Sequence, residues 1–172
     1  MRHAVCAFVI LLGLVGGPPR AHADFQLGGI ALYNGDVTKI GSTPLSSADF
    51  SFGLESRFLF FNVIQIGLTG LYYLPASPDQ PSYILTLADV GLSAKILILR
   101  LGAGVGPDFF IPMSGPAVEA TSIANLKLSA DIELGPVSLG VTAFYPVQSL
   151  GDFRNIPSMT PWFGVALLVR LF

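Results

Sequence analysis

Charged residues stand at alternate positions in several stretches of the chain, and this spacing limits the chemistry that they can do. Glu55 precedes Arg57 by two residues, and Lys127, Asp131 and Glu133 also keep an even spacing. Residues two apart share one face of a β-strand, so these side chains would gather on one side of a sheet. Opposite charges held there away from water should pair, because an unpaired buried charge is costly.

The candidate site is therefore a polar network rather than a set of catalytic groups. Asp89 belongs to the same group of charges. The predicted network consists of Glu55, Arg57, Gln65, Lys95, Arg100, Asn125, Lys127, Asp131, Glu133 and Arg170.

The N-terminal residues predict a secretory signal peptide. A basic start is followed by an apolar run over residues 4–15 and by the small-x-small pattern Ala21-His22-Ala23. The apolar run is shorter than the about 20 residues that a membrane-spanning helix needs. We therefore expect residues 1–23 to be a signal peptide cleaved after Ala23, and residues 24–172 to form one domain.

Removal of this segment would leave a chain without histidine or cysteine. His3, His22 and Cys6 are the only residues of these types, and all three precede the expected cleavage site. Histidine-dependent triads, thiol nucleophiles and the usual zinc sites are then excluded. We expect no catalytic residue, no metal and no cofactor, and therefore no enzymatic activity.

The clearest strand pattern lies in residues 122–147, where apolar and polar residues alternate on both sides of Gly135 and Pro136. The rest of the chain repeats this hairpin more loosely. Four segments each contain a polar residue, an aliphatic residue and a glycine in succession and run into aromatic and then turn-forming residues, while four other segments resemble one another. The first set is 25–35, 64–75, 99–112 and 136–146, and the second is 54–58, 92–96, 128–132 and 167–171.

The connections alternate between long and short, as in an antiparallel meander. Long connections rich in Gly, Pro, Ser and Asp follow the first set, at residues 34–47, 75–82, 112–121 and 147–161. Tight turns follow the second set, at Phe61 and Asn62, at Leu97 and Ile98, and at Gly135 and Pro136. Residues 95–100 contain none of the usual turn formers, so a single longer strand is the alternative there.

Composition favours a transmembrane β-barrel. Only 12% of the residues are charged and the mean hydropathy is +0.66, whereas soluble domains average about 25% charged residues. No uninterrupted apolar segment of 18 residues follows the expected signal, so membrane helices are not predicted. The fold class that we predict is all-β, an eight-stranded antiparallel up-and-down transmembrane barrel with short turns at one end and longer loops at the other.

The register assigns charged residues to the lumen and apolar residues to lipid. A soluble barrel with these faces inverted is the alternative, but its outer face would be mostly Gly, Ser and Thr with few charges. Aromatic residues near the loop-side strand ends predict an interfacial girdle, although strand propensity alone would also place them there. The lipid-facing set includes Phe50, Phe52, Leu54, Phe58, Phe60, Ile64, Ile66, Leu68 and Tyr72, and the girdle set is Tyr33, Tyr72, Tyr73, Phe109, Phe110, Phe144 and Tyr145.

In its signal, strand pattern, connection lengths and terminal Phe172, the chain resembles the small eight-stranded outer-membrane barrels. This group includes outer membrane protein W, outer membrane protein X and the membrane domain of outer membrane protein A. The resemblance implies the outer membrane of a diderm bacterium, with outer-membrane lipid and the barrel assembly machinery as partners. It also implies that Phe172 is the assembly signal. Arg170 stands two positions before it, so either a bulge resets the phase or the machinery recognises a variant signal.

The resemblance and the network together leave two functions. The first is a structural barrel or a narrow permeability path for small solutes, apolar ones included. An eight-stranded lumen is filled by side chains, which favours a plug over a path. Gly102, Gly104 and Gly106 would leave space for a path or would only let the strands bend.

The alternative function is a surface-exposed adhesion or ligand-binding barrel that acts through its extracellular loops, which contain Lys39, Phe153, Arg154 and Ile156. Nucleic acid is excluded as a partner, because the formal net charge is −2 and there is no basic patch. Some barrels of the same group modify lipid A with a catalytic histidine, which the domain lacks. The loop acids Asp36, Asp49, Asp79 and Asp152 are interpreted as turn formers.

Overall fold

The computed structural model describes residues 23–35, 37, 40–42, 44–73, 82–114, 122–154, 156 and 159–172. The expected signal peptide lies outside these residues, except for Ala23, which begins the first strand. Asp36, Lys39 and Asp79 also lie outside them. None of the helices in the described ranges has the length and apolar character needed to cross a membrane.

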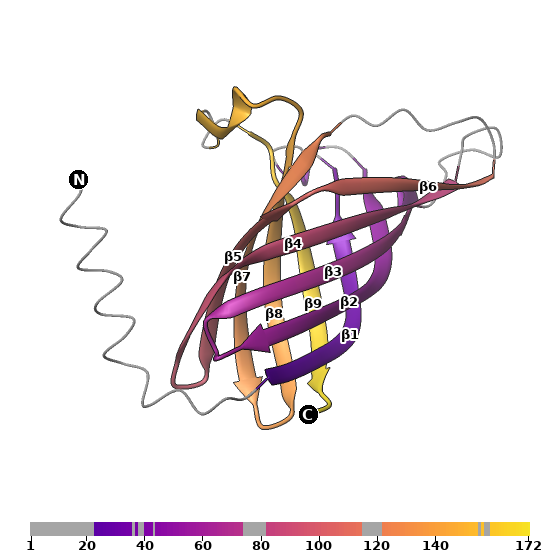
Figure 1. Cartoon of the computed structure of the whole chain (residues 1–172). Coiled ribbons are helices and arrows are strands. Elements are labelled where there is room, and N and C mark those ends of the chain that lie inside the picture. The colour runs from indigo at the N-terminus through magenta and orange to yellow at the C-terminus, as the bar shows by residue number, and fades with distance from the viewer. Residues whose placement is uncertain are drawn as a thin grey trace.

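Alternating residues produce strands that belong to one antiparallel sheet (Figure 1). Two short 3-10 helices, η2 (Ser47–Asp49) and η3 (Asp152–Arg154), lie in loops. The strands are β1 (Ala23–Tyr33), β2 (Phe50–Phe60), β3 (Ile64–Tyr73), β4 (Ser82–Ile96), β5 (Leu99–Gly106), β6 (Asp108–Ser114), β7 (Ala124–Leu134), β8 (Val137–Val147) and β9 (Trp162–Arg170).

The sheet closes into an eight-stranded up-and-down barrel. Its order is β3-β2-β1-β9-β8-β7-β5-β4-β6, and the pairing of β3 with β4 closes it. β5 and β6 are successive parts of one strand, because both pair with β4 and only Pro107 separates them. Proline has no N–H to give to a ladder, which accounts for the interruption. The predicted fold class is confirmed.

The short turns lie at the three predicted places. Phe61 and Asn62 have φ angles of 54° and 58°, Leu97 has 56° and Gly135 has 65°, the left-handed conformation that tight hairpins require. The turn between β4 and β5 is therefore at Leu97 and Ile98, and the single longer strand considered for this segment is wrong. Figure 1 shows the start of β1 and the end of β9 at this same end of the barrel.

The two faces of the wall have the register that the sequence predicts. The side chains of Leu54 and Val141 point outward and are 65% and 58% exposed, whereas Glu55 and Arg57 point inward and are fully buried. The outer wall is thus apolar and the charged residues are inside, as in a transmembrane barrel. The inverted alternative, a soluble barrel with a polar outer face, is wrong.

Gly53 allows a close approach between strands β2 and β3. A Cβ atom at Gly53 would lie 1.7 Å from the carbonyl oxygen of Gly70, which is backbone and cannot move aside cheaply. A Cβ atom at Gly70 would meet nothing within 4 Å. These two neighbouring glycines therefore differ in whether the wall tolerates a side chain.

We predict that Gly53→Ala destabilises the barrel by about 1–3 kcal/mol, the usual cost of overpacking. Gly70→Ala is the matched control and should leave the free energy of unfolding nearly unchanged. Both values can be measured by urea unfolding in lipid vesicles. Equal stabilities for the two variants would contradict the close approach.

Candidate functional site: the polar network of the lumen

All ten residues of the predicted network lie on the inner side of the wall. Eight of them are buried, while Lys95 and Arg170 lie nearest the short-turn end, with side chains 34% and 28% exposed. The residues come from β2, β3, β4, β5, β7 and β9, so most of the circumference contributes. Nine of them form two groups, which we call the central cluster and the turn-side cluster; Asn125 lies apart from both and donates from Nδ2 to Oδ1 of Asp108 at 2.7 Å.

The central cluster spans the lumen between β2 and β7. The Nη1 atom of Arg57 donates to Oδ2 of Asp131 at 2.6 Å, and its Nε atom donates to Oε1 of Glu55 at 2.7 Å. Lys127 donates from Nζ to the same Glu55 oxygen at 2.7 Å and lies 3.5 Å from Oδ2 of Asp89. Because β2 and β7 are four places apart in the closed ring of eight strands, these ion pairs cross the barrel.

The turn-side cluster is centred on one carboxylate, that of Glu133. Arg100 donates from Nε to Oε1 at 2.6 Å, Arg170 donates from Nη2 to Oε2 at 3.0 Å, and Lys95 also donates to Oε2. Arg170 is in addition 3.3 Å from a carboxylate oxygen of Asp24. Three cations thus share Glu133, and this end of the lumen has a positive excess.

Several partners were absent from the predicted set. Asp24 pairs with Arg170, while Asn62 and Ser93 accept from Arg100 at 3.2 and 3.1 Å. Ser93 could have been found, because it lies two positions before Lys95 on β4, whereas β1 has no predicted member from which Asp24 could have been placed. Asn62 lies in a turn, where alternation gives no signal.

Glycines make room for the buried carboxylates. Gly67 lies opposite Asp89 and Gly140 lies opposite Asp131 in the ladders, and a Cβ atom at either glycine would come within 1.9 Å of a carboxylate oxygen. The β5 glycines also have close neighbours: Gly102 and Gly104 face polar side chains, whereas Gly106 meets the backbone oxygen of Ala88. Cβ atoms at these three positions would lie 2.6 Å from Ser129 Oγ, 2.7 Å from Asp89 Oδ1 and 1.9 Å from Ala88 O.

The loop-side half of the lumen is mainly apolar, which the sequence did not predict, although Asn125, Asp108 and Ser122 form a polar group there. Tyr73 and Phe144 are buried there and Phe110 packs against them, so their expected place in an outer aromatic girdle is wrong. The physical reason is strand phase, because adjacent residues such as Tyr72 and Tyr73 point to opposite faces. The buried cluster consists of Ile30, Leu32, Leu71, Tyr73, Leu85, Leu87, Phe144, Ala166 and Leu168.

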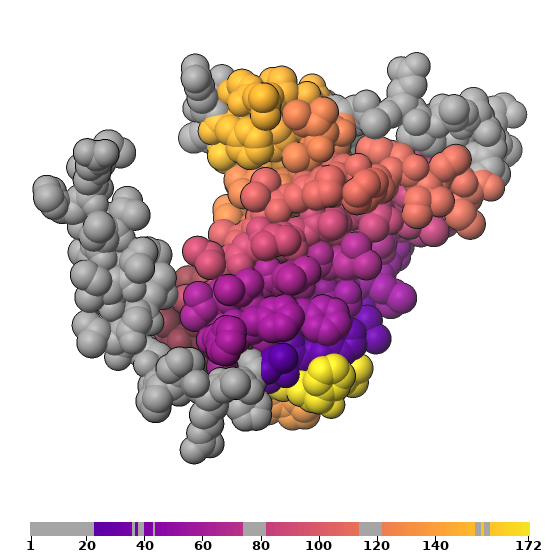
Figure 2. Space-filling model, viewed as in Figure 1, coloured from indigo at the N-terminus to yellow at the C-terminus, as the bar shows by residue number. Residues whose placement is uncertain are grey.

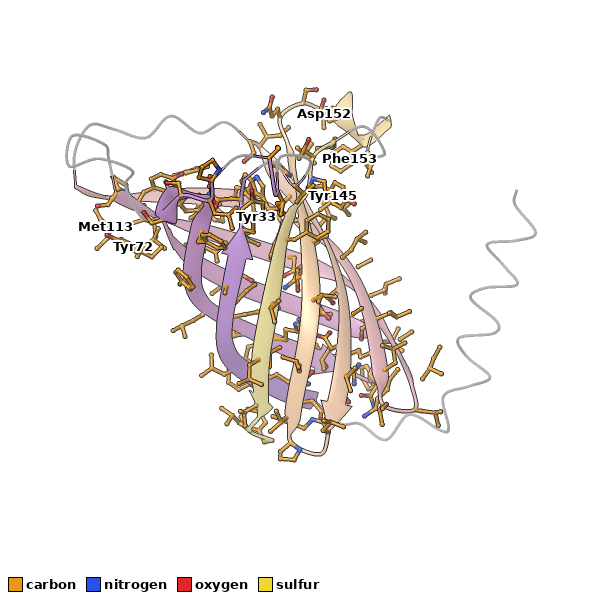
Figure 3. The ribbon with its side chains drawn as sticks, turned by 180° about the vertical axis from the view of Figure 1, so that it is seen from behind. Tyr33, Tyr72, Met113, Tyr145, Asp152 and Phe153 are labelled. Atoms are coloured by element: carbon orange, nitrogen blue, oxygen red, sulfur yellow. The ribbon has the colours of Figure 1, made fainter. Side chains whose placement is uncertain are left out.

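The two halves of the lumen meet at Lys127. Its Nζ atom lies 5.5 Å from the centre of the Phe144 ring, a cation–π contact, while it pairs with the central cluster on the other side. Figure 3 shows Tyr33, Tyr72 and Tyr145 near the loop-side ends of their strands. The lumen is therefore charged toward the short turns and aromatic toward the loops.

A β-bulge determines the position of Phe172. Leu171 donates its N–H to the Phe25 carbonyl and Phe25 donates to the Phe172 carbonyl, both at 2.9 Å, so two residues oppose one. The Phe172 ring lies 5.6 Å from that of Phe25, which stacks on Phe58 at 4.4 Å. The bulge that the sequence raised as one of two explanations for the phase of Phe172 is therefore present. The role of Phe172 as an assembly signal stays a prediction.

Two of the loop acids cap turns. Asp152 accepts from the backbone N–H groups of Gln148 and Ser149, each at 2.8 Å, and these hydrogen bonds lower the pKa of its carboxyl group. Asp49 accepts from the backbone of Ser46 at 2.8 Å. Within the described ranges, no three His, Cys, Asp or Glu side chains are grouped so that they could hold a metal ion.

We predict that Lys127→Met destabilises the barrel by about 3–5 kcal/mol, because it leaves buried carboxylates uncompensated. Lys95→Met, at the partly exposed end, should cost no more than about 1 kcal/mol. The double variant Glu55→Gln with Lys127→Met keeps the net charge of the central cluster and should recover part of the loss. Chemical unfolding in vesicles measures all three, and equal costs for the two lysines would contradict a closed central cluster.

Comparison with known proteins gives little further information. No family model matches the sequence, and no curated protein matches it. Among solved structures, the chain is similar to a de novo designed protein, TMB2.3, whose structure was determined by solution NMR. The two are 11% identical with a TM-score of 0.49, and the match covers 87% of this chain and 96% of that chain.

Proposed function

We propose that this protein is an integral outer-membrane β-barrel with a structural role, whose lumen is closed by its own side chains. One observation carries this proposal: two ion pairs cross the barrel, Arg57 with Asp131 and Lys127 with Glu55. The three largest fully buried side chains, Arg57, Arg100 and Lys127, all belong to the network. Side chains of this size occupy the width of an eight-stranded barrel.

Membrane insertion is supported by the outer wall. Every strand but β1, which exposes Leu27 alone among its large apolar side chains, offers a row of exposed aliphatic or aromatic side chains, while Lys127 and the other charged residues of the central cluster point inward. A Lys or Arg on the lipid face at mid-bilayer would cost about 2–4 kcal/mol. The resemblance to small outer-membrane barrels supplies the orientation that we propose, with the short turns on the periplasmic side of the membrane and the loops on the outer side.

A narrow path for small solutes would require the central cluster to rearrange. Its ion pairs would have to exchange partners, since Glu55 and Asp131 are fully or almost fully buried and need a positive neighbour. The apolar loop-side half would favour apolar solutes over hydrated ones. This path is therefore the less supported part of the proposal.

We expect the reconstituted protein to show no steady conductance above the background of a protein-free planar bilayer. A general porin in the same membrane serves as the positive control. Folding of the same preparation is checked by the faster gel migration of unboiled protein. Persistent current steps, or uptake of small solutes into loaded liposomes, would contradict the closed lumen and would support the path.

Surface binding is the second candidate, because apolar side chains are exposed on the loop between β8 and β9. Leu150 is 80% exposed and Phe153 is 39% exposed, and Figure 2 shows this yellow-orange loop projecting beyond the barrel wall. Asp152 caps the turn that carries Leu150, accepting from the backbone N–H groups of Gln148 and Ser149. An exposed pair of this kind would suit an apolar patch of an extracellular ligand.

If the loop binds a ligand, Leu150→Ser with Phe153→Ser should lower the adhesion of expressing cells to octyl-coated beads. The double variant should keep the gel migration of the folded barrel, since neither residue contacts the lumen clusters. Gly151→Ser, on the same loop, is the control. Unchanged adhesion in the double variant would exclude this patch as a binding surface.

A further inference from the structure

The short turns present an apolar rim. Its six residues, which we call the turn rim, are Phe61, Val63, Leu97, Ile98, Leu134 and Val137, and they are between 38% and 88% exposed. Leu97, at 88%, is the most exposed large apolar side chain in the described part of the chain. Turns that face water usually carry Gly, Asn, Asp or Ser. In the three turns of this barrel, Asn62 has the one polar side chain.

Two residues of the turn rim occupy backbone positions that disfavour them. Phe61 and Leu97 have φ angles of 54° and 56°, in the left-handed region where Gly and Asn are favoured. A bulky residue there strains the backbone and exposes apolar surface at the same time. A barrel can tolerate both the backbone strain and the exposed apolar surface only where that surface does not contact water.

Three backbone carbonyls of the turns are paired within the barrel. The carbonyls of Val63, Ile98 and Pro136 each accept an N–H from a neighbouring strand at 2.7 Å. Pro136 has no N–H of its own to satisfy. An unsatisfied backbone group in hydrocarbon would cost several kilocalories per mole, so the pairing of these three carbonyls lowers the cost of placing the turns at the edge of the hydrocarbon.

The acceptor atoms of the one polar turn residue are also paired within the barrel. The Oδ1 atom of Asn62 accepts from Arg100 at 3.2 Å, and its backbone carbonyl accepts from the Ser93 hydroxyl at 3.3 Å. Its acceptors are thus directed into the barrel rather than toward an aqueous phase.

The turn rim continues the lipid-facing wall without a polar border. Ile64, Ile96, Leu99 and Ile132 stand next to it on the outer face and are each at least 38% exposed. β2 and β7 have 11 residues each, which span about 26 Å at the usual rise and a tilt of about 45°. Since the apolar band of such barrels is about 25 Å tall, the turns lie where the hydrocarbon ends.

We propose that the turn rim is inserted among the acyl chains of the nearer phospholipid leaflet, at their boundary with the headgroups, and does not project into water. Lys95 and Arg170, which line the mouth inside the rim, then stand at the level of the lipid phosphates, where their positive excess is favourable. The partner of this surface is the bilayer itself. The inference depends on membrane insertion of the barrel, as proposed above.

Single-tryptophan reporters test this depth. Trp162 is the only tryptophan, so Trp162→Phe gives a background without one. Into it are placed Leu97→Trp and Phe61→Trp on two different turns, Leu150→Trp on the loop, and Val165→Trp on the outer wall. Each variant is reconstituted in phosphatidylcholine vesicles and exposed to acyl-brominated phosphatidylcholine or to aqueous acrylamide, after its folding has been checked by gel migration.

Brominated lipid should quench both turn reporters several-fold more than the Leu150→Trp loop reporter, and acrylamide should show the reverse order. Leucines 97 and 150 are similarly exposed in the isolated protein, so the lipid alone separates them. Turn reporters that respond to acrylamide like the loop reporter would overturn the inference and would indicate a rim left for a protein partner. The Val165→Trp reporter distinguishes the two proposals: if brominated lipid fails to quench it, membrane insertion itself is wrong.

Discussion

The crossing of the lumen by ion pairs between β2 and β7 is the constraint on which the rest of the structure depends. Arg57 and Lys127 lie on opposite walls and each reaches a carboxylate on the other side. Charges buried this deeply must be paired, so the diameter of the barrel is limited to the reach of these side chains. Glycines at the ladder positions opposite Asp89 and Asp131 follow from it, because the carboxylates need the space of the missing side chains.

The division of the lumen into two halves separates two kinds of stabilisation. Toward the short turns, specific hydrogen-bonded ion pairs hold the walls together, and their geometry admits few alternatives. Toward the loops, Leu71, Phe144 and their neighbours pack as an ordinary apolar core. In that core, complementary side-chain shape matters more than hydrogen-bond direction. Lys127 belongs to both, through its carboxylate partner and through its contact with the Phe144 ring. The interior therefore resembles a small soluble core stacked on a salt-bridged one.

Much of the fold could be predicted from the sequence, because the alternation of residue types with a period of two shows which side chains of a strand face the lumen and which face outward. The same alternation located the ten network residues on the inner wall. It could not identify their partners, since the contact of Arg57 with Asp131 depends on how many strands close the ring and with what stagger. The phase of Arg170 and Phe172 raised a bulge as one of two alternatives, but the sequence could not decide between them, because a bulge depends on backbone hydrogen bonds rather than on residue type. The girdle error at Tyr73 was avoidable, since its neighbour Tyr72 already occupied the outer face.

The seam between β1 and β9 has a consequence for the order of events during biogenesis. Gln26 is in register with Arg170, so the barrel is closed by segments from nearly opposite ends of the described chain. Contacts between residues so distant in sequence form late and slowly. Until β9 has been synthesised, β1 presents an unpaired edge and an apolar face, a combination that aggregates readily. A chain of this design needs to be kept extended, by a chaperone or by the membrane machinery, until its final strand is available.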